Sequence, residues 1–591
     1  MKNIRNTSLI FLISSFLFLS CKKDFLVRQP QGSLSENALA TSSGIDGLLT
    51  GAYAALDGQN LVANATAWGT SASNWLFGSV VGGDAHKGSQ GGDQLQMNPI
   101  FNFYADASNP FFDEKWRADF EGVSRCNQVL KVLEKVKDLS DESRVNIKAQ
   151  ARFLRAHYYF DLKKMFDKVP WIDESVTDFN QPNDQDIWSK IEADLSFAMD
   201  SLPETQPEIG RANKWAAAAY LARTYLYEGK YQDAKNIFDQ VIAEGKTSNG
   251  LKDDLNAQFE DNFRPEKESS SPEAIFSIEM AVNVGTSGSI ANGNQGDMLN
   301  FPYPNSPWCC GFFQPTQDLV NSFRTDPVTG LPYLDDYNLH PVKNDMGISS
   351  DQPFVTDQGT LDPRLDWTVG RRGIPYLDWG NHPGMTWIRD QAYGGPYSPK
   401  KNLYWQATKD QYYDASTWAP GTAINYVIIS FSDVLLMAAE CESQLGNLDK
   451  AEEYVNRIRD RAANKNGWVY AYKDPANPLT GFSATPAANY FIMDYSNGEF
   501  AAKGKDYALK AIYFERKLEL AMEGYRFFDL VRWGIADTAL NAYFGYENKI
   551  TTDLDIAHFT KGKNEYYPIP QSEIDLSVTS GKQTLIQNPG Y

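Results

Sequence analysis

Histidine and cysteine are scarce in this chain, with five of each among its 591 residues. The histidines show no metal-ligand spacing, and the cysteines form neither a CxxC pattern nor a disulfide framework. The HExxH, GxSxG, GxGxxG and P-loop motifs are absent as well. We therefore expect no metal, no cofactor and no enzymatic activity. A glycosidase needs only two suitably placed carboxylates, and the 75 Asp and Glu residues leave that alternative open.

Basic residues are too few to balance the acidic ones, since 55 Lys and Arg stand against 75 Asp and Glu, for a net charge of -20. This charge argues against a nucleic-acid partner and against adsorption to an anionic membrane surface. Aromatic residues, in contrast, are abundant, with 14 Trp, 31 Tyr and 33 Phe. A core does not need so many amphipathic rings, so we expect many of them near the surface.

Only the N-terminus carries a long apolar run. Lys2 and Arg5 precede the run 9–19, which is too short to span a bilayer as a helix and ends in Ser20-Cys21. This pattern resembles a bacterial lipoprotein signal, whose cleavage leaves Cys21 as a lipid-modified first residue. An ordinary secretory signal with an incidental cysteine is the alternative. Several acyl chains on Cys21 would give a stable anchor, and they would be the only membrane attachment.

Helical periodicity dominates three regions, 116–165, 187–245 and 432–463, and a companion helix is predicted at 507–524. The segment 246–425 is instead rich in Gly, Pro, Asn, Asp and aromatic residues. So long a stretch without periodicity is unusual unless its loops are functional. We therefore predict a mostly α protein whose helices support layered loops and short strands.

A weak internal repeat lies within the helical regions. In each copy a helix stops at Gly, and an apolar residue and then Ala follow two and five positions later. Gly accepts the left-handed cap and Ala allows close helix packing, which is the logic of a tetratricopeptide hairpin. The two copies contain Gly229, Tyr231 and Ala234, and Gly446, Leu448 and Ala451.

Several segments together resemble the SusD/RagB family of nutrient-binding outer-membrane lipoproteins, and they follow the family order. The clearest block is 515–534, which contains ERKLEL followed by EGYRFFDLVRWG. The departure is Ser430-Phe431, where the family commonly has Arg. The other matching segments are 150–162, 169–170, 210–214, 273–278, 425–429, 433–436, 566–570 and 587–591.

The resemblance implies a mostly α fold, with a tetratricopeptide-like helical hairpin scaffold, a large loop-rich ligand-binding face and short strands. It also implies capture of a glycan for a SusC-like TonB-dependent outer-membrane transporter, by a protein that is lipid-anchored in the outer membrane and faces the cell surface. A peptide ligand, or a purely structural lid on the transporter, are the alternatives. The expected organisation is a signal peptide at 1–20, a tether at 21–40, a helical region at 41–245 and a ligand-binding region at 246–591.

Three glutamates in the family block, Glu515, Glu519 and Glu523, share one helix face at i,i+4 spacing, close to Arg516, Arg526 and Arg532. Such a stripe is compatible with a metal or an acid–base pair. A structural Glu/Arg network is the interpretation that we favour.

Sugar binding needs aromatic platforms and polar side chains on rigid loops, and we predict ligand contacts in three loops. The first loop has Trp75, Asp84 and Lys87, with a Gly-rich turn stabilised by Asp84 as the alternative. The second has Tyr303 and Trp308, where Trp308 either touches ligand or packs under its loop. Cys309 and Cys310, next to it, form either a vicinal disulfide or two buried thiols.

The third predicted loop joins two arginines to several rings. A guanidinium fits vicinal hydroxyls or a carboxylate, although salt bridges to Asp362 and Asp366 are the favoured alternative for the arginines. The candidate ligand-binding residues of this loop are Arg371, Arg372, Trp379, Trp387 and Tyr393.

Overall fold

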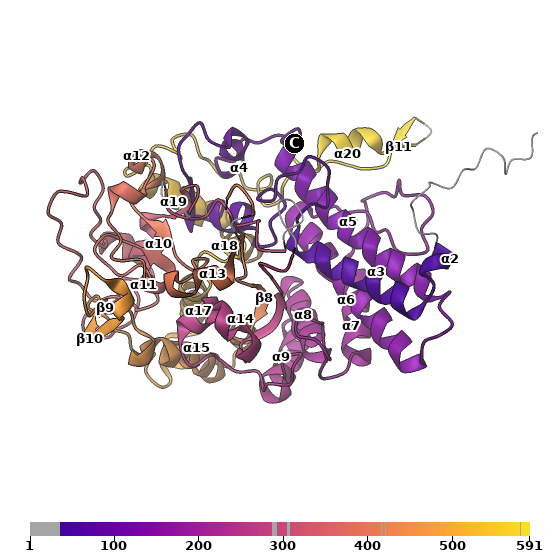
Figure 1. The fold of residues 1–591 in the computed structure, drawn as a ribbon, viewed down its shortest axis with the longest axis horizontal. Coiled ribbons are helices and arrows are strands. Elements are labelled where there is room, and N and C mark those ends of the chain that lie inside the picture. Colours follow the sequence, from indigo (N-terminus) through magenta and orange to yellow (C-terminus); the bar gives the residue numbers. More distant parts are fainter. Residues whose placement is uncertain (1–35, 286–291, 304–307, 415, 420, 580) are drawn as a thin grey trace, which may run out of the picture.

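The computed structural model describes residues 36–285, 292–303, 308–414, 416–419, 421–579 and 581–591 (Figure 1). Cys21, the proposed lipidation site, lies outside them. Long helices form one side of the molecule and the lower centre of the view, and loops with short strands form the other side. The long helices are α3 (Ser42–Ala54), α5 (Pro110–Leu133), α6 (Asp141–Phe166), α7 (Trp188–Ser201), α8 (Lys214–Tyr227), α9 (Tyr231–Glu244), α14 (Phe431–Leu445), α15 (Leu448–Ala463), α17 (Lys505–Glu519) and α19 (Ala536–Glu547).

Helix starts follow local capping chemistry. The Ser140 side chain accepts a hydrogen bond from Ser143 N at 3.1 Å at the start of α6, and the Asn213 side chain accepts one from Ala216 N at 2.8 Å at the start of α8. Such caps satisfy backbone donors that the first turn leaves unpaired. Ser430 caps α14 in the same way, which gives a local role to the position where the family commonly has Arg.

The predicted hairpins are confirmed. Gly229 ends α8 with a φ of 72° and Gly446 ends α14 with a φ of 89°, a region that residues with a side chain rarely adopt. Ala234 and Ala451 are both fully buried in the second helices. Because α9 also packs against α14, the two hairpins form one continuous helical stack.

The segment 246–425, between the two hairpins, consists mainly of loops, short helices and short strands, as predicted. The central ribbon pairs β2 (Ala274–Ile278) with β8 (Tyr426–Ser430) in antiparallel register, Ser277 opposite Val427. The other strands are β1 (Ala85–Gly88), β3 (Phe312–Pro315), β4 (Val369–Gly370), β5 (Ser398–Pro399), β6 (Tyr413–Asp414), β7 (Gly421–Thr422), β9 (Tyr470–Tyr472), β10 (Phe482–Pro486), β11 (Val578–Thr579) and β12 (Lys582–Gln583). The short helices are α2 (Glu36–Leu39), α4 (Asn98–Phe101), α10 (Gln317–Ser322), α11 (Leu365–Thr368), α12 (Gln391–Gly394), α13 (Lys409–Tyr412), α16 (Glu499–Lys503), α18 (Arg526–Arg532) and α20 (Gln571–Leu576).

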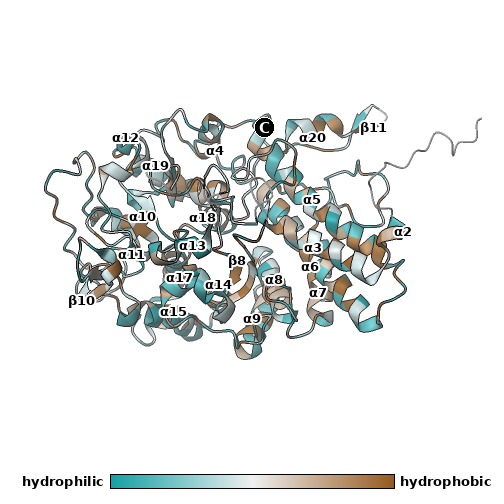
Figure 2. Ribbon diagram, in the orientation of Figure 1, coloured by the Kyte–Doolittle hydropathy of each residue, from teal (hydrophilic) through white to brown (hydrophobic). Residues whose placement is uncertain are grey.

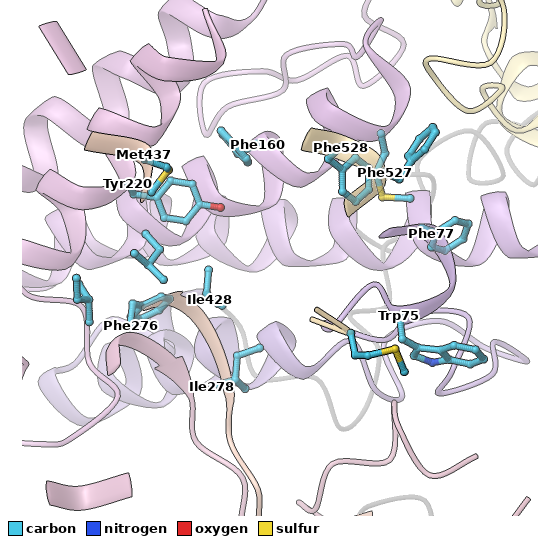
Figure 3. Close-up of a cluster of buried hydrophobic side chains, with 14 of the residues drawn as sticks. Trp75, Phe77, Phe160, Tyr220, Phe276, Ile278, Ile428, Met437, Phe527 and Phe528 are labelled. Carbon is cyan, nitrogen blue, oxygen red and sulfur yellow. The ribbon is translucent and has the colours of Figure 1, made fainter. Parts of the chain in front are cut away.

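The hydrophobic core is continuous from the helices into the loop side. Hydrophobic and hydrophilic residues alternate along the helices on the right of the view (Figure 2). Such alternation is typical of helices that bury one face and expose the other. In the close-up of the core, Tyr220 and Phe160 from the helices lie above Phe276 and Ile428 of the central ribbon (Figure 3). The division of the chain into regions 41–245 and 246–591 stays a prediction.

Helix α17 ends at Glu519, five residues earlier than predicted, and its glutamates serve structure. Arg364 Nη2 lies 2.7 Å from Glu515 Oε1, and Arg364 Nη1 lies 2.9 Å from Glu519 Oε2. Glu523 follows the helix end and pairs with Lys401 at 2.6 Å instead. The favoured Glu/Arg network therefore holds for two of the three glutamates, with arginines from distant segments. Arg516 and Arg532 bind Asp433, Asp529 and Glu440.

A candidate ligand-binding face

Trp75, in the first predicted loop, lies inside the core. Only 1% of its surface is exposed, and its Nε1 donates to Gly296 O at 3.1 Å. Phe312 and Phe313 meet the ring edge-on, and Figure 3 shows it beside the core residues. The residue opens a six-residue π-helix, Trp75–Val80, which is buried throughout. The ring is therefore not available to a ligand at the protein surface.

Asp84 and Lys87 are buried in the same region: Asp84 directly precedes β1 and Lys87 lies within it. The Asp84 carboxylate accepts hydrogen bonds from Ser79 Oγ at 3.0 Å and Met522 N at 3.1 Å, and burial raises its pKa. Lys87 Nζ donates to the carbonyls of Gln90 at 3.1 Å and Asp93 at 2.5 Å. Burial lowers the pKa of Lys87 to about 8. Both side chains therefore hold the turn together, which is the alternative that we predicted for Asp84.

Trp308, in the second loop, stands at the centre of an aromatic cluster. Its ring centroid lies 4.9 Å from those of Trp379 and Trp387 and 5.9 Å from that of Tyr376. Trp308 is 7% exposed, whereas Trp379 and Trp387 are partly exposed. The second loop thus supplies the buried centre, and the third loop supplies the rings that reach solvent. We call Trp308, Trp379 and Trp387 the tryptophan cluster.

Next to Trp308, a disulfide joins Cys309 to Cys310, so the vicinal disulfide is the alternative that the structure adopts. Tyr303 is partly exposed. The Arg389 guanidinium lies 4.9 Å above the Tyr303 ring and binds Asp93 Oδ2 at 2.6 Å. Cation–π contact and ion pair together fix this ring in place.

The two adjacent arginines of the third loop are occupied by the protein itself. Arg371 binds both carboxylate oxygens of Asp366, at 2.6 and 2.8 Å, as the salt-bridge alternative predicted. Arg372 donates to the carbonyls of Ser350 at 2.9 Å and Gln352 at 2.6 Å. Both side chains are buried, so neither guanidinium group faces solvent. Tyr393 is partly exposed, and its hydroxyl donates to Asn98 Oδ1 at 3.1 Å.

Two tryptophans that we did not predict form the most exposed aromatic pair of the region. Trp418, in the hairpin between β6 and β7, is 69% exposed. Its ring stands edge-on to the partly exposed Trp68, with 6.0 Å between centroids. Trp68 Nε1 donates to Gln94 Oε1 at 3.2 Å, which fixes its orientation. Trp418 precedes Ala419-Pro420-Gly421, so a Trp next to a proline in a loop is the sequence signal that could have singled it out.

A chain of contacts connects the Trp68–Trp418 pair to the tryptophan cluster. Gln94 binds Trp68 and follows Asp93, which holds Arg389 over Tyr303. The Tyr303 backbone then donates to Trp387 O at 3.1 Å. We call this surface the loop face; it consists of Trp68, Gln94, Tyr303, Trp379, Trp387, Arg389 and Trp418.

Among the described residues, no three His, Cys, Asp or Glu side chains gather as metal ligands would. None of the helices in the described ranges combines the length and apolarity that crossing a bilayer requires. What the loop face offers is rings with open edges or faces, flanked by amide and guanidinium donors. This combination suits ligands with flat apolar surfaces and many hydroxyl groups.

The SusD family model matches residues 272–591, more than half of the chain. The chain belongs to the SusD family. A second family model, described as starch-binding and associating with the outer membrane, matches residues 24–226. Membership explains why the helical hairpins and the loop side occur together in one protein.

Full-length relatives support this assignment. SusD-like protein P2 of Formosa agariphila is 24% identical over 610 residues, covering 100% of both chains. A laminarin-binding SusD-like protein of known structure has a TM-score of 0.64 at 22% identity, over 93% of this chain and 100% of that chain. Surface glycan-binding protein A of Bacteroides thetaiotaomicron, solved with laminarihexaose, has a TM-score of 0.60 at 21% identity, over 93% and 99%.

Proposed function

We propose that this SusD-family protein binds an oligo- or polysaccharide on its loop face. The observation that carries the proposal is the Trp68–Trp418 pair, because Trp418 is 69% exposed and still oriented by a neighbouring ring. Unlike a singly exposed ring, Trp418 lies beside the partly exposed Trp68, and contiguous exposed apolar patches often mark ligand-binding sites. Two proteins of the same fold, one described as laminarin-binding and one solved with laminarihexaose, support a glycan as the ligand class.

Binding at each ring is modest in this proposal. Sugar hydroxyls exchange water for protein partners, so each hydrogen bond adds only about 0.5–1.5 kcal/mol net. Stacking on several rings spread over the loop face, from Trp418 to Trp379, compensates by contacting consecutive sugar units of one chain. The arrangement favours a polymer or a long oligosaccharide over a single sugar on this surface. Capture, and not hydrolysis, is the activity that we propose.

The same proposal places the protein at the cell surface, anchored in the outer membrane through Cys21, with a SusC-like TonB-dependent transporter as partner. Support comes from the lipoprotein-like signal and from the family model that names association with the outer membrane. Replacing Cys21 with Ser in the source bacterium tests the anchor, because the protein should then leave the membrane fraction. Affinity purification of the anchored protein tests the partner by co-recovery of a TonB-dependent barrel.

Affinity gels containing plant, fungal, algal and host polysaccharides, laminarin among them, test glycan binding. We expect at least one polymer to retard the wild type and to retard Trp418→Ala much less. Phe179→Ala is the matched control, since Phe179 is 70% exposed but lies between α6 and α7. Equal loss in both variants would argue against the loop face. If no polymer retards the wild type, peptide ligands or a lid role replace glycan capture. Release of sugar products would instead identify a hydrolase.

A further inference from the structure

A cavity of about 90 Å³ lies beside the first loop, between the central ribbon and the segment 399–402. The aromatic rings of Trp75, Phe259 and Phe313 form part of its wall. Its lining is distinct from the loop face, because Trp75 is buried and the exposed tryptophans do not contribute. The proposed function gives this cavity no role.

The Asn300 side chain lines the cavity and lacks partners among the described residues on both of its polar atoms. Its side chain is 1% exposed, and within the described ranges neither Nδ2 nor Oδ1 makes a hydrogen bond. Its backbone is satisfied, because its carbonyl accepts from Asn402 Nδ2 at 3.0 Å and its N–H donates to Asp297 O at 2.9 Å. Burying an unpaired amide costs about 1–3 kcal/mol. A molecule in the cavity would remove this cost.

Two charged residues of the cavity, Lys401 and Asp297, already have partners within the protein. Lys401 Nζ binds Glu523 Oε1 at 2.6 Å and Glu519 O at 3.1 Å. The Asp297 carboxylate accepts from Ser73 Oγ at 2.6 Å and from Asn294 Nδ2 at 2.8 Å. Glu273 Oε1 is buried without a hydrogen bond in the described ranges, and burial raises the pKa of this carboxyl. The cavity therefore offers a ligand the amide donor and acceptor of Asn300 and the Glu273 carboxyl.

We infer that this cavity binds a single small neutral polyhydroxyl molecule, a sugar ring or a shorter polyol, through the Asn300 amide. A hydroxyl both donates and accepts, so neighbouring hydroxyls satisfy Oδ1 and Nδ2 together. A cation would leave Nδ2 unpaired, and an anion would approach the buried carboxylates of Glu519 and Glu523. The aromatic walls match the C–H faces of such a molecule, and the volume exceeds the space of one water.

Isothermal titration of the purified protein with D-glucose, D-galactose, N-acetylglucosamine and glycerol tests the inference. We expect at least one probe to bind the wild type at millimolar concentration, and to bind Asn300→Leu at least tenfold more weakly. Trp418→Ala should bind that probe as the wild type does, because Trp418 does not line the cavity. The two variants therefore test the cavity and the loop face separately, so either hypothesis can be wrong without the other.

Thermal unfolding separates this role from a structural one. Leu removes an unpaired buried amide at similar volume, so the Tm of Asn300→Leu should equal or exceed that of the wild type. Asn300→Asp, which loses the donor, is the second variant if Asn300→Leu does not fold, and it should also weaken binding. The inference is overturned if no probe binds the wild type, if Asn300→Leu binds equally well, or if sugar-soaked crystals show only water on Asn300.

Discussion

The Trp418 ring stands at 88° to the Trp68 ring, with 6.0 Å between their centroids. One residue comes from the hairpin between β6 and β7, and the other from the loop that precedes Trp75–Val80. Their edge-on contact uses little of the Trp418 surface, which stays 69% exposed. The pair is therefore an oriented but open platform, and its two rings have different roles: Trp68 supports and Trp418 is free for contact.

Trp418→Ala should weaken glycan binding without unfolding the protein. The ring is mostly exposed, so its removal should change the free energy of unfolding by no more than about 0.5 kcal/mol. Loss of one stacking partner should weaken binding about tenfold, which corresponds to about 1.4 kcal/mol. Affinity gels and denaturant unfolding measure the two effects. A large loss of stability would show that Trp418 is structural.

Trp308→Ala should instead lower the stability of the protein strongly. Trp308 is 7% exposed and contacts Trp379, Trp387 and Tyr376, so its removal leaves a cavity under the loops. Comparable core substitutions cost about 3–5 kcal/mol. We expect a lower denaturation midpoint, with binding reduced because the supported rings move. Unchanged stability with lost binding would mean that Trp308 itself contacts ligand.

The comparison of Trp75 with Trp418 shows why the scaffold was easier to predict than the site. Caps and apolar periodicity act within a few residues, so the end of α6, the end of α8 at Gly229 and the start of α14 could be predicted closely. Burial of a loop ring is decided by segments far away in the chain: Phe312 and Phe313 cover Trp75, and nothing comparable covers Trp418. No local pattern distinguishes these two cases.

The arginines illustrate the same limit. Arg371 pairs with Asp366, five positions away, and the sequence alone indicated this partner. Arg364 instead joins Glu515 and Glu519 across most of the C-terminal half. The helix end at Glu519 was also missed, because Met522 and Gly524 adopt left-handed conformations, and the Met522 backbone is held by the distant Asp84.

Arg364→Ala should destabilise the protein strongly. The guanidinium is fully buried between Asp362, Glu515 and Glu519, and its removal leaves carboxylates without their shared cation. Breaking a buried network of this kind costs about 3–5 kcal/mol. Lys510→Ala is the control on the same helix as Glu515, because the Lys510–Asp335 pair is exposed and should contribute less than about 1 kcal/mol. Equal effects of the two substitutions in urea unfolding would contradict the prediction.

His86 links β1 to the C-terminal part of the chain by charge, and this contact should make stability depend on pH. His86 Nδ1 lies 2.8 Å from Asp553 Oδ2, and Nε2 lies 3.1 Å from Glu547 Oε1. Burial opposes the charged imidazole, but the two carboxylates outweigh it and raise the pKa of His86 to about 10. The unfolded value is about 6.5. The folded state thus holds the proton more tightly, so the stabilisation is complete below pH 6.5 and is lost as pH rises towards 10.

His86→Gln should therefore be less stable than the wild type at pH 6, and the difference should shrink steadily between pH 6.5 and 10. Gln keeps hydrogen-bonding groups near both carboxylates but carries no charge, so the pH-dependent part of the difference reports the imidazolium. Urea unfolding of both proteins at several pH values in this window measures it. A difference that stays constant from pH 6 to 10 would show that His86 is neutral in the folded protein and that the two carboxylates do not hold its proton.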